Sequence, residues 1–341
     1  MTSSASDKPE ASGADGNRIY ERLDPDTIFR CLEAGGLFCS GHLQALNSYE
    51  NRVYQVGIED DNDVIAKFYR PGRWSVAQIL EEHAFSQELA DADLPAVAPL
   101  RHADGRTLLT VDAFRFSLYP RQGGRSPHLD DPHQLKRIGR LLARLHNVSA
   151  VADFEARPAL TLERFGTDAV TSLLESGFIP ADVEGAYRAI TTQLIDTIDD
   201  IFHRVGPVEL LRLHGDCHPG NLLWSRDVPH LVDFDDAQTG PAIQDLWMFL
   251  SGEGDYLAAR LENLLDGYQQ FRDFEAAELR LIEPLRALRM IHYAAWIAGR
   301  WDDGAFPQAF PWFNTRTYWD KHVLDLKEQA AALLEPPLQM P

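Results

Sequence analysis

Apolar and polar residues alternate along the first third of the chain, and this alternation predicts β-strands. Between residues 43 and 70 it runs on both sides of the polar turn "EDDND", which predicts a hairpin with "VIAKFY" as the returning strand. The later stretch "RTLLTVDAFRFSLYPRQGG" predicts two more strands. Between them, "SVAQILEEHAFSQELADADL" has apolar residues at helical spacing behind a possible cap, Ser75. The first 120 residues therefore predict a small sheet with one helix.

The period of the pattern changes after "PRQGGR". The stretch "DPHQLKRIGRLLARLHNVS" and most of 155–210 and 255–335 have apolar residues at helical spacing, and the short apolar strands "NLLW" and "HLVDF" lie between these blocks. The expected fold class is therefore α+β, with two lobes. We expect a mobile tail over 1–18, a β-rich lobe over 19–119 and a larger helical lobe over 120–338.

Composition narrows the class of protein. A chain of 341 residues with 25% charged residues is typical of a globular enzyme, and its net charge of -20 argues against a nucleic-acid partner. Three cysteines are too few for a disulfide framework, and no apolar run is long enough for a signal core or a membrane span. We expect a cytoplasmic monomer that binds neither nucleic acid nor membrane.

One stretch, "RLHGDCHPGNLLWSRDVPHLVDFDDAQTGPAIQDLW", concentrates chemically capable side chains. It allows a transition-metal site, a Mg-nucleotide site, or polar turns that only end strands. His214, Cys217 and His218 offer donors for zinc, but no clear fourth ligand follows and carboxylates outnumber soft donors. Oxygen donors such as Asn221 and Asp233 suit Mg²⁺ instead.

The order of these residues favours phosphoryl transfer. Asp216 and Asn221 stand at the D-x-x-x-x-N interval of a kinase catalytic loop, and Asp233 follows an apolar strand. Lys67 lies on the predicted returning strand, ahead of Glu81 and Glu82 on the next helix. An ordered set of a base, two metal ligands and a phosphate-binding lysine is a strong signal.

The chain resembles the bacterial stress-response kinases of the aminoglycoside and choline kinase-like branch of the protein-kinase-like fold. The motifs that carry the resemblance include "LNSYENRVYQV", "AKFYRPGRWS", "QILEEHAF", "LRLHGDCHPGNLLW" and "VDFDDAQTGPAIQDLWMFL". The resemblance spans roughly residues 20–338. It implies a bilobal fold and an ATP- and Mg²⁺-dependent kinase that acts on serine and threonine of proteins, in the response to stress.

The resemblance also implies roles for single residues. Asp216 corresponds to the catalytic base, and Asn221 and Asp233 to the ligands of Mg²⁺, with Asp233 counted among the catalytic residues. Lys67 corresponds to the lysine on the α- and β-phosphates, and we favour Glu82 over Glu81 as its partner.

The segment that should cover the phosphates has no glycine. Ser48 and Asn51 are therefore expected to hydrogen-bond phosphate oxygens, Ser48 because the family pattern places an ATP-contacting serine there. An ordinary Asn-Ser turn is the alternative.

Further polar residues allow two interpretations each. Asp245 resembles the buried aspartate that receives backbone N–H groups of the catalytic loop, but it could simply start a helix. Asp235 and Asp236 are expected to be solvated turn carboxylates, and His146 to interact with carbonyls at a helix end. Arg286 and Arg289 are expected to be paired structural arginines, with a substrate-anion site as the alternative.

Two other functions remain open at this point. A small-molecule kinase for aminoglycoside-, choline- or homoserine-like hydroxyls would keep every residue named for ATP. A non-catalytic nucleotide-binding adaptor would lack a base, a lysine or a metal ligand, whereas Asp216, Lys67, Asn221 and Asp233 are all present.

Overall fold

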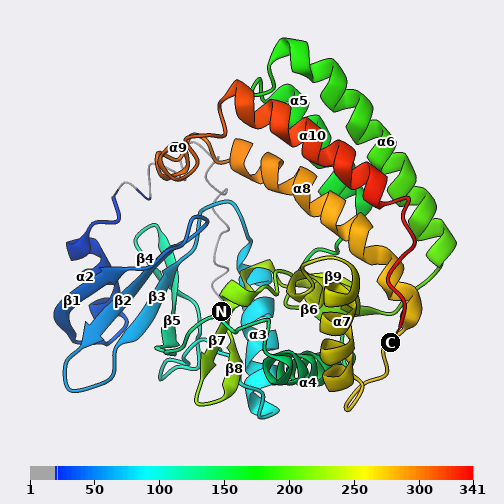
Figure 1. Cartoon of the computed structure of the whole chain (residues 1–341). Helices are drawn as coiled ribbons and strands as arrows, with labels where there is room; N and C mark the ends of the chain where they lie inside the picture. The colour runs from blue at the N-terminus through cyan, green and yellow to red at the C-terminus, as the bar shows by residue number, and fades with distance from the viewer. Residues whose placement is uncertain (1–19, 21, 341) are drawn as a thin grey trace, which may run out of the picture. The chain divides into compact units, whose positions relative to one another are not determined.

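The computed structural model describes residue 20 and residues 22–340, so the tail predicted over 1–18 lies outside the described residues. The chain forms two compact units. The first unit comprises the described residues up to Gln87 together with Val97–Gln122. The second unit comprises Glu88–Ala96 and the chain from Gly123 onward. The five-stranded sheet lies in the first unit and most helices lie in the second, as the predicted α+β class requires (Figure 1).

The sheet of the first unit is antiparallel, with the strand order β1-β2-β3-β5-β4. The strands are β1 (Cys39–Ala45), β2 (Arg52–Ile58), β3 (Val64–Phe68), β4 (Leu109–Val111) and β5 (Phe114–Pro120). The predicted hairpin is confirmed as β2 and β3, and its register places Val53 opposite Lys67. Lys67 is therefore held on the middle strand of the sheet.

The first unit contains a helix that the sequence pattern did not predict, so the expectation of a single helix is wrong. This helix, α2 (Pro25–Ala34), begins at the Asp24 carboxylate, which accepts the Thr27 N–H at 2.8 Å. It buries Ile28, Cys31 and Leu32 in one apolar cluster with residues of the sheet. In Figure 1 it lies beside β1.

Helix α3 (Val76–Asp91) begins where the sequence predicts it. The Ser75 hydroxyl accepts the Gln78 N–H at 3.2 Å, and the Gln78 side chain accepts the Ser75 N–H at 2.9 Å. This reciprocal pair is a capping box, so the predicted Ser75 cap is confirmed. The division between the two units falls within α3, after Gln87.

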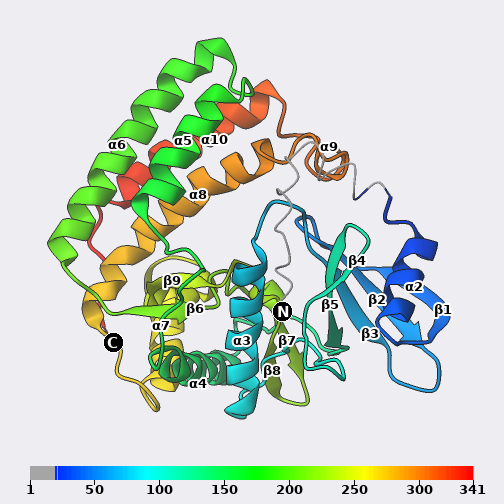
Figure 2. The same ribbon diagram turned by 180° about the vertical axis from the view of Figure 1, so that it is seen from behind.

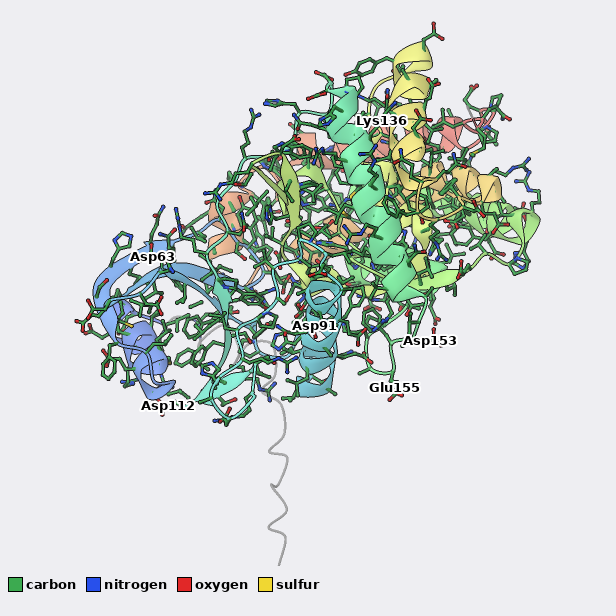
Figure 3. All side chains as sticks on the ribbon, turned by 90° about the horizontal axis from the view of Figure 1, so that it is seen from below. Asp63, Asp91, Asp112, Lys136, Asp153 and Glu155 are labelled. Carbon is green, nitrogen blue, oxygen red and sulfur yellow. The ribbon has the colours of Figure 1, made fainter. Side chains whose placement is uncertain are left out.

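Two long helices of the second unit, α4 (Pro132–Ser149) and α7 (Gly254–Tyr268), pack unusually closely. A methyl group at Gly139 would lie 2.0 Å from the Leu264 carbonyl oxygen, and one at Gly267 would lie 2.0 Å from that of Lys136. Figure 3 shows Lys136 on α4, and its ammonium pairs with Asp266 of α7 at 3.0 Å. Glycine at both positions therefore lets the two backbones touch.

The remaining helices of the second unit build a separate apolar core, which confirms the helical blocks of the sequence. All of them except the short helix at Ala305–Ala309 run beside one another in both ribbon views (Figures 1 and 2). These helices are α5 (Asp168–Glu175), α6 (Ala181–Val205), α8 (Ile282–Ala298), α9 (Ala305–Ala309) and α10 (Arg316–Ala332), with a π-helical turn at Glu163–Thr167 before α5. Among the described residues, no helix is both long and apolar enough to cross a bilayer.

Two small antiparallel pairs of strands complete the second unit. In one pair, β7 (Leu222–Ser225) and β8 (Val228–Leu231), the strands were predicted but their pairing was not, and β8 covers only the first two residues of the predicted "HLVDF". The other pair, β6 (Leu210–Leu213) and β9 (Gln238–Pro241), was not predicted. The loops that follow β6 and β8 carry most of the candidate chemistry.

Candidate active site

The loop after β6 passes very close to the turn after β8. Gly215 has a φ of +85°, and a methyl group there would lie 2.0 Å from the Asp236 carbonyl oxygen. Any other residue would be strained by its backbone conformation and would clash with that carbonyl. Glycine at this position therefore allows "HGD" and "VDFDD" to lie side by side.

The hairpin β7–β8 brings Asn221 and Asp233 together. Its register pairs Leu222 with Leu231, which places Asn221, just before the hairpin, next to Val232, just after it. The Val232 N–H donates to the Asn221 carbonyl at 3.1 Å. Asp233 comes next, with φ 63° and ψ 70°. A non-glycine residue in this left-handed region costs energy and is often found at a functional position.

The Asn221 side chain is oriented by the backbone of Asp216. Its Nδ2 donates to the Asp216 carbonyl at 2.9 Å, which leaves the amide oxygen as the atom that can bind a cation. Asp233 adds a carboxylate on an exposed residue. One neutral and one anionic oxygen fit Mg²⁺, which binds few protein ligands and completes its shell with water and phosphate.

The Asp216 carboxylate is contacted on both oxygens. Arg289 of α8 donates to Oδ1 at 2.7 Å, and His218 Nε2 lies 3.5 Å from Oδ2. Since His218 Nδ1 accepts the Gly220 N–H at 2.9 Å, the ring proton of neutral His218 is on Nε2 and points to the carboxylate. Burial would raise the pKa of Asp216, but His218 and the Arg289 charge hold it well below its usual range.

Asp245 fixes the backbone of the loop before Asp216. Its two oxygens accept the N–H groups of His214 and Gly215 at 2.8 and 2.9 Å, and the side chain is fully buried. The interpretation of Asp245 as the aspartate that receives loop N–H groups is confirmed. The helix-start alternative is wrong, because Asp245 ends a 3-10 turn, η4 (Ala242–Asp245), and starts no α-helix.

His146 extends this network to α4 and α7. Its Nε2 lies 3.4 Å from the Asp245 carboxylate, and its Nδ1 lies 2.7 Å from the hydroxyl of Tyr268. The expectation that His146 serves terminal carbonyls of its helix is wrong. The closely packed helix pair therefore supports the catalytic loop through two buried side chains.

In the first unit, Lys67 and Glu82 are both buried charged residues. Lys67 Nζ lies 5.5 Å from the centre of the Tyr69 ring, and the charges of both residues act on Tyr69. Burial is the main cause of the raised Tyr69 pKa; Glu82 raises it further and Lys67 lowers it. A buried carboxylate needs a nearby cation, and Glu81 is less buried than Glu82, so the environment favours Glu82 as the partner of Lys67.

The structure places Ser48 and Asn51 in the loop between β1 and β2. Ser48 is partly exposed, as a phosphate ligand requires. Asn51 is buried, and its amide oxygen accepts the Arg70 N–H at 3.1 Å. Asn51 thus ties the loop to the end of β3, and its predicted contact with phosphate stays a prediction.

Comparison with known proteins decides the family. The profile of the phosphotransferase enzyme family matches residues 42–282, a range that excludes Arg289 but includes Ser48, Lys67, Glu82, Asp216, Asn221 and Asp233. The chain belongs to this phosphotransferase family. Its relatives include stress response kinase A of Escherichia coli (strain K12), at 42% identity over 94% of this chain and 97% of that one. The serine/threonine protein kinase RdoA of Salmonella typhimurium is 41% identical over the same shares.

Solved structures with the same fold include two kinases that are named for small molecules. An amicoumacin kinase in complex with AMP-PNP, Ca²⁺ and Ami has a TM-score of 0.73 at 18% identity, over 94% of this chain and 97% of that one. A microcompartment-associated aminopropanol kinase has a TM-score of 0.70 at 21% identity, over 90% and 96%. At these identities the likeness establishes the fold. The family and the curated relatives make this phosphotransferase a kinase, and the solved structures show that it has the predicted protein-kinase-like type of fold.

The zinc alternative finds no support in the phosphotransferase site. In the part of the chain that the structure describes, no group of three or more His, Cys, Asp or Glu side chains could hold a metal ion. His214 Nε2 is 3.0 Å from the Val232 carbonyl oxygen, and burial raises the pKa of the Cys217 thiol. These two side chains serve packing and backbone hydrogen bonding.

Three further residues refine or extend the prediction. Asp235 is buried, so its expected solvation is wrong, whereas Asp236 is partly exposed. Buried Arg157 holds this turn by donating to the carbonyls of Asp235 and Ala237, at 2.5 and 2.7 Å. No pattern around Arg157 marks it, because its partners lie far along the chain.

Glu278 is a buried carboxylate that sequence reasoning missed. It accepts the Ile243 N–H at 2.8 Å and so supports the turn that carries Asp245. Burial raises its pKa from 4.5 to about 7. The folded protein therefore holds this proton more tightly than the unfolded chain does, and the contribution of Glu278 to the free energy of unfolding falls as pH rises from about 4.5 to about 7.

We expect Glu278→Gln to raise the free energy of unfolding at pH 8 by about 2 kcal/mol and to change it little at pH 5. Glutamine keeps an oxygen for the Ile243 N–H but carries no charge to bury. Urea unfolding at both pH values measures the difference, and Glu262→Gln, at an exposed position of α7, is the control. An equal gain at both pH values would contradict a titrating Glu278.

Proposed function

We propose that this kinase is an ATP- and Mg²⁺-dependent serine/threonine protein kinase that acts in a bacterial stress response. The observation that carries the proposal is the hydrogen bond from Asn221 Nδ2 to the Asp216 carbonyl. It joins the candidate base to one candidate metal ligand, and the β7–β8 hairpin adds Asp233 as the other. Phosphoryl transfer needs a base for the acceptor hydroxyl and ligands for the metal ion, and these three residues would supply both.

In this proposal, Asp216 accepts the proton of the acceptor hydroxyl as the oxygen attacks the γ-phosphorus and the bond to the leaving ADP oxygen breaks. Asn221 and Asp233 hold Mg²⁺, which neutralises charge on the phosphate oxygens when bound. The bond from Arg289 and the polarised His218 N–H keep the Asp216 carboxylate ionised and oriented.

The first unit supplies the proposed contacts with the nucleotide. Lys67 would bind the α- and β-phosphates, and Glu82 would orient it. Ser48 would donate a hydrogen bond to a phosphate oxygen from the glycine-free loop, and Asn51 would contribute there chiefly by fixing the loop to Arg70. Because Lys67 and Glu82 are both buried, their side chains are held in position before ATP binds.

A protein acceptor is favoured by the relatives at 41–42% identity, one of which bears the name serine/threonine protein kinase. A small hydroxyl compound is the second candidate, because the structural neighbours act on amicoumacin and aminopropanol according to their names. The presence of Asp216, Lys67, Asn221 and Asp233 argues against a non-catalytic adaptor.

The test is phosphoryl transfer from γ-labelled ATP by the purified full chain with Mg²⁺. One set of reactions contains casein as a generic protein acceptor, and a parallel set contains a panel of amino alcohols and aminoglycosides. We expect label on serine and threonine of casein or of the kinase itself. Label on small molecules alone would replace the protein acceptor by the second candidate.

A further inference from the structure

Arg289 touches the candidate base although it is remote from it in the chain. It projects from α8, and only Nη1 of its guanidinium is used, at 2.7 Å from Asp216 Oδ1. Its remaining N–H groups have no protein partner among the described residues, and its side chain is 42% exposed. A guanidinium has five N–H donors in a rigid fork, so most of its binding capacity is left for another group.

An acceptor that reaches Asp216 must also meet Arg289. The acceptor hydroxyl has to approach a carboxylate oxygen to about 2.7 Å, and two donors on the same oxygen lie about 4–5 Å apart. The Asp216 side chain is 24% exposed, and its other oxygen is next to His218. The atoms beside the reacting hydroxyl therefore lie within contact range of the guanidinium.

The charge of this position decides which acceptors fit. An ammonium group next to the acceptor hydroxyl would be repelled by the Arg289 guanidinium. A carboxylate or phosphate at the same place would accept hydrogen bonds from the remaining guanidinium N–H groups and form a charge-assisted pair. The net charge of -20 opposes an anionic ligand only weakly here, because charges beyond about 8 Å are largely screened at physiological salt.

We propose that Arg289 determines acceptor specificity: it selects hydroxyl acceptors that carry a negative charge beside the reacting hydroxyl and disfavours ammonium-bearing ones. This inference rests on the proposed function, since it takes Asp216 as the base. For a protein acceptor, it means serine or threonine with acidic neighbours. Arg286, one turn earlier on α8, is committed elsewhere, because it pairs with Glu283 at 3.2 Å and stacks over Trp247.

The test is equilibrium binding to the full chain loaded with Mg²⁺ and AMP-PNP. Labelled peptides Ala-Asp-Ser-Asp-Ala, Ala-Asn-Ser-Asn-Ala and Ala-Lys-Ser-Lys-Ala are compared by fluorescence anisotropy. We expect the acidic peptide to bind about tenfold more tightly than the neutral one, the scale of one charge-assisted hydrogen bond, and the basic peptide to bind most weakly. This comparison needs only the wild-type protein.

Arg289→Gln should abolish the preference for the acidic peptide and leave AMP-PNP affinity unchanged, and Arg289→Lys should keep part of the preference. Arg188→Gln is the matched control, because it removes the same charge from a surface ion pair on α6. A preference that is absent in the wild type, or that survives in Arg289→Gln, would overturn the proposal.

A second experiment asks whether the recognised anion belongs to a peptide or to a small hydroxy acid. Calorimetric titration with D-glycerate and with ethanolamine asks whether a small hydroxy acid is recognised without a peptide. Glycerate binding that depends on Arg289, with no binding of any peptide, would keep the role of Arg289 and defeat the protein acceptor. Absence of a charge preference in both experiments would defeat the role of Arg289, whatever phosphoryl transfer the enzyme performs.

Discussion

Asp216→Asn is expected to lower turnover by about three orders of magnitude while leaving the affinity for ATP nearly unchanged. Asparagine has almost the shape of aspartate and can still accept a hydrogen bond from Arg289, so the loop should keep its structure. What it loses is the ability to take the hydroxyl proton. Steady-state rates with casein, together with calorimetric titration of AMP-PNP, measure the two effects separately.

The control for this change is Asp227→Asn in the turn between β7 and β8. Asp227 has a φ of 64°, a conformation that asparagine tolerates well, and it pairs with Arg137 at 2.7 Å. The control removes the same charge from the neighbouring β7–β8 turn and leaves Asp216, the proposed base, unchanged. A loss of nucleotide affinity as large as the loss of rate would argue that Asp216 serves the nucleotide instead.

The second large effect is expected for Asp233→Asn. If Asp233 is the anionic ligand of Mg²⁺, its neutral replacement removes several kcal/mol of charge stabilisation, so the rate should fall on the order of a thousandfold. Asparagine is the suitable replacement, because φ at this position is 63° and asparagine is among the residues that adopt such values most readily. The loss therefore reports on charge rather than on backbone strain.

Asn221→Ala provides the contrast. It removes a neutral oxygen and the hydrogen bond to the Asp216 carbonyl, so some activity should remain and should rise with Mg²⁺ concentration. Rates measured against Mg²⁺ concentration for both variants distinguish the ligands. If Asp233→Asn recovered full activity at the Mg²⁺ concentration that saturates the wild type, Asp233 would not be the main metal ligand.

The strongly periodic elements were predictable from the sequence. Helix α4 has an apolar stripe and begins at Asp131, whose side chain accepts the His133 N–H, while α3 begins with the capping pair of Ser75 and Gln78. The β2–β3 hairpin alternates clearly on both sides of its turn. In each case local pattern and tertiary structure agree, which is the condition under which sequence reasoning works.

Elements formed by long-range contacts were not predictable. The strand β9 has the sequence "QTGP", whose glycine and proline argue against a strand, and it forms because β6 pairs with it. Likewise, the apolar run after Asp245 predicts a helix, but the carboxylate is used by the N–H groups of His214 and Gly215. Tertiary hydrogen bonds outweigh local propensity there.

Two features that were missed, helix α2 and the partner of Arg289, differ in how far the sequence could have shown them. Helix α2 carried a readable signal, since Asp24 is followed by Pro25 at the first helical position. Arg289 was singled out in the sequence, with a substrate-anion site as the alternative to a structural ion pair, but no pattern identified its remote partner Asp216. The resemblance supplied the candidate base and the candidate metal ligands but not this pairing, and only the fold brings α8 to Asp216.

The buried chain from Tyr268 through His146 to Asp245 couples the opening of the His214–Gly215 loop to the packing of α4 against α7. The N–H groups of His214 and Gly215 donate to the fully buried carboxylate of Asp245. Local opening of the loop would therefore leave this buried carboxylate without these donors or break its contact with His146 of α4. Its opening free energy is thereby tied to the separation of α4 from α7. The segment that leads to Asp216, the proposed base, is therefore ordered before a substrate binds, because buried contacts with α4 and α7 hold it in place.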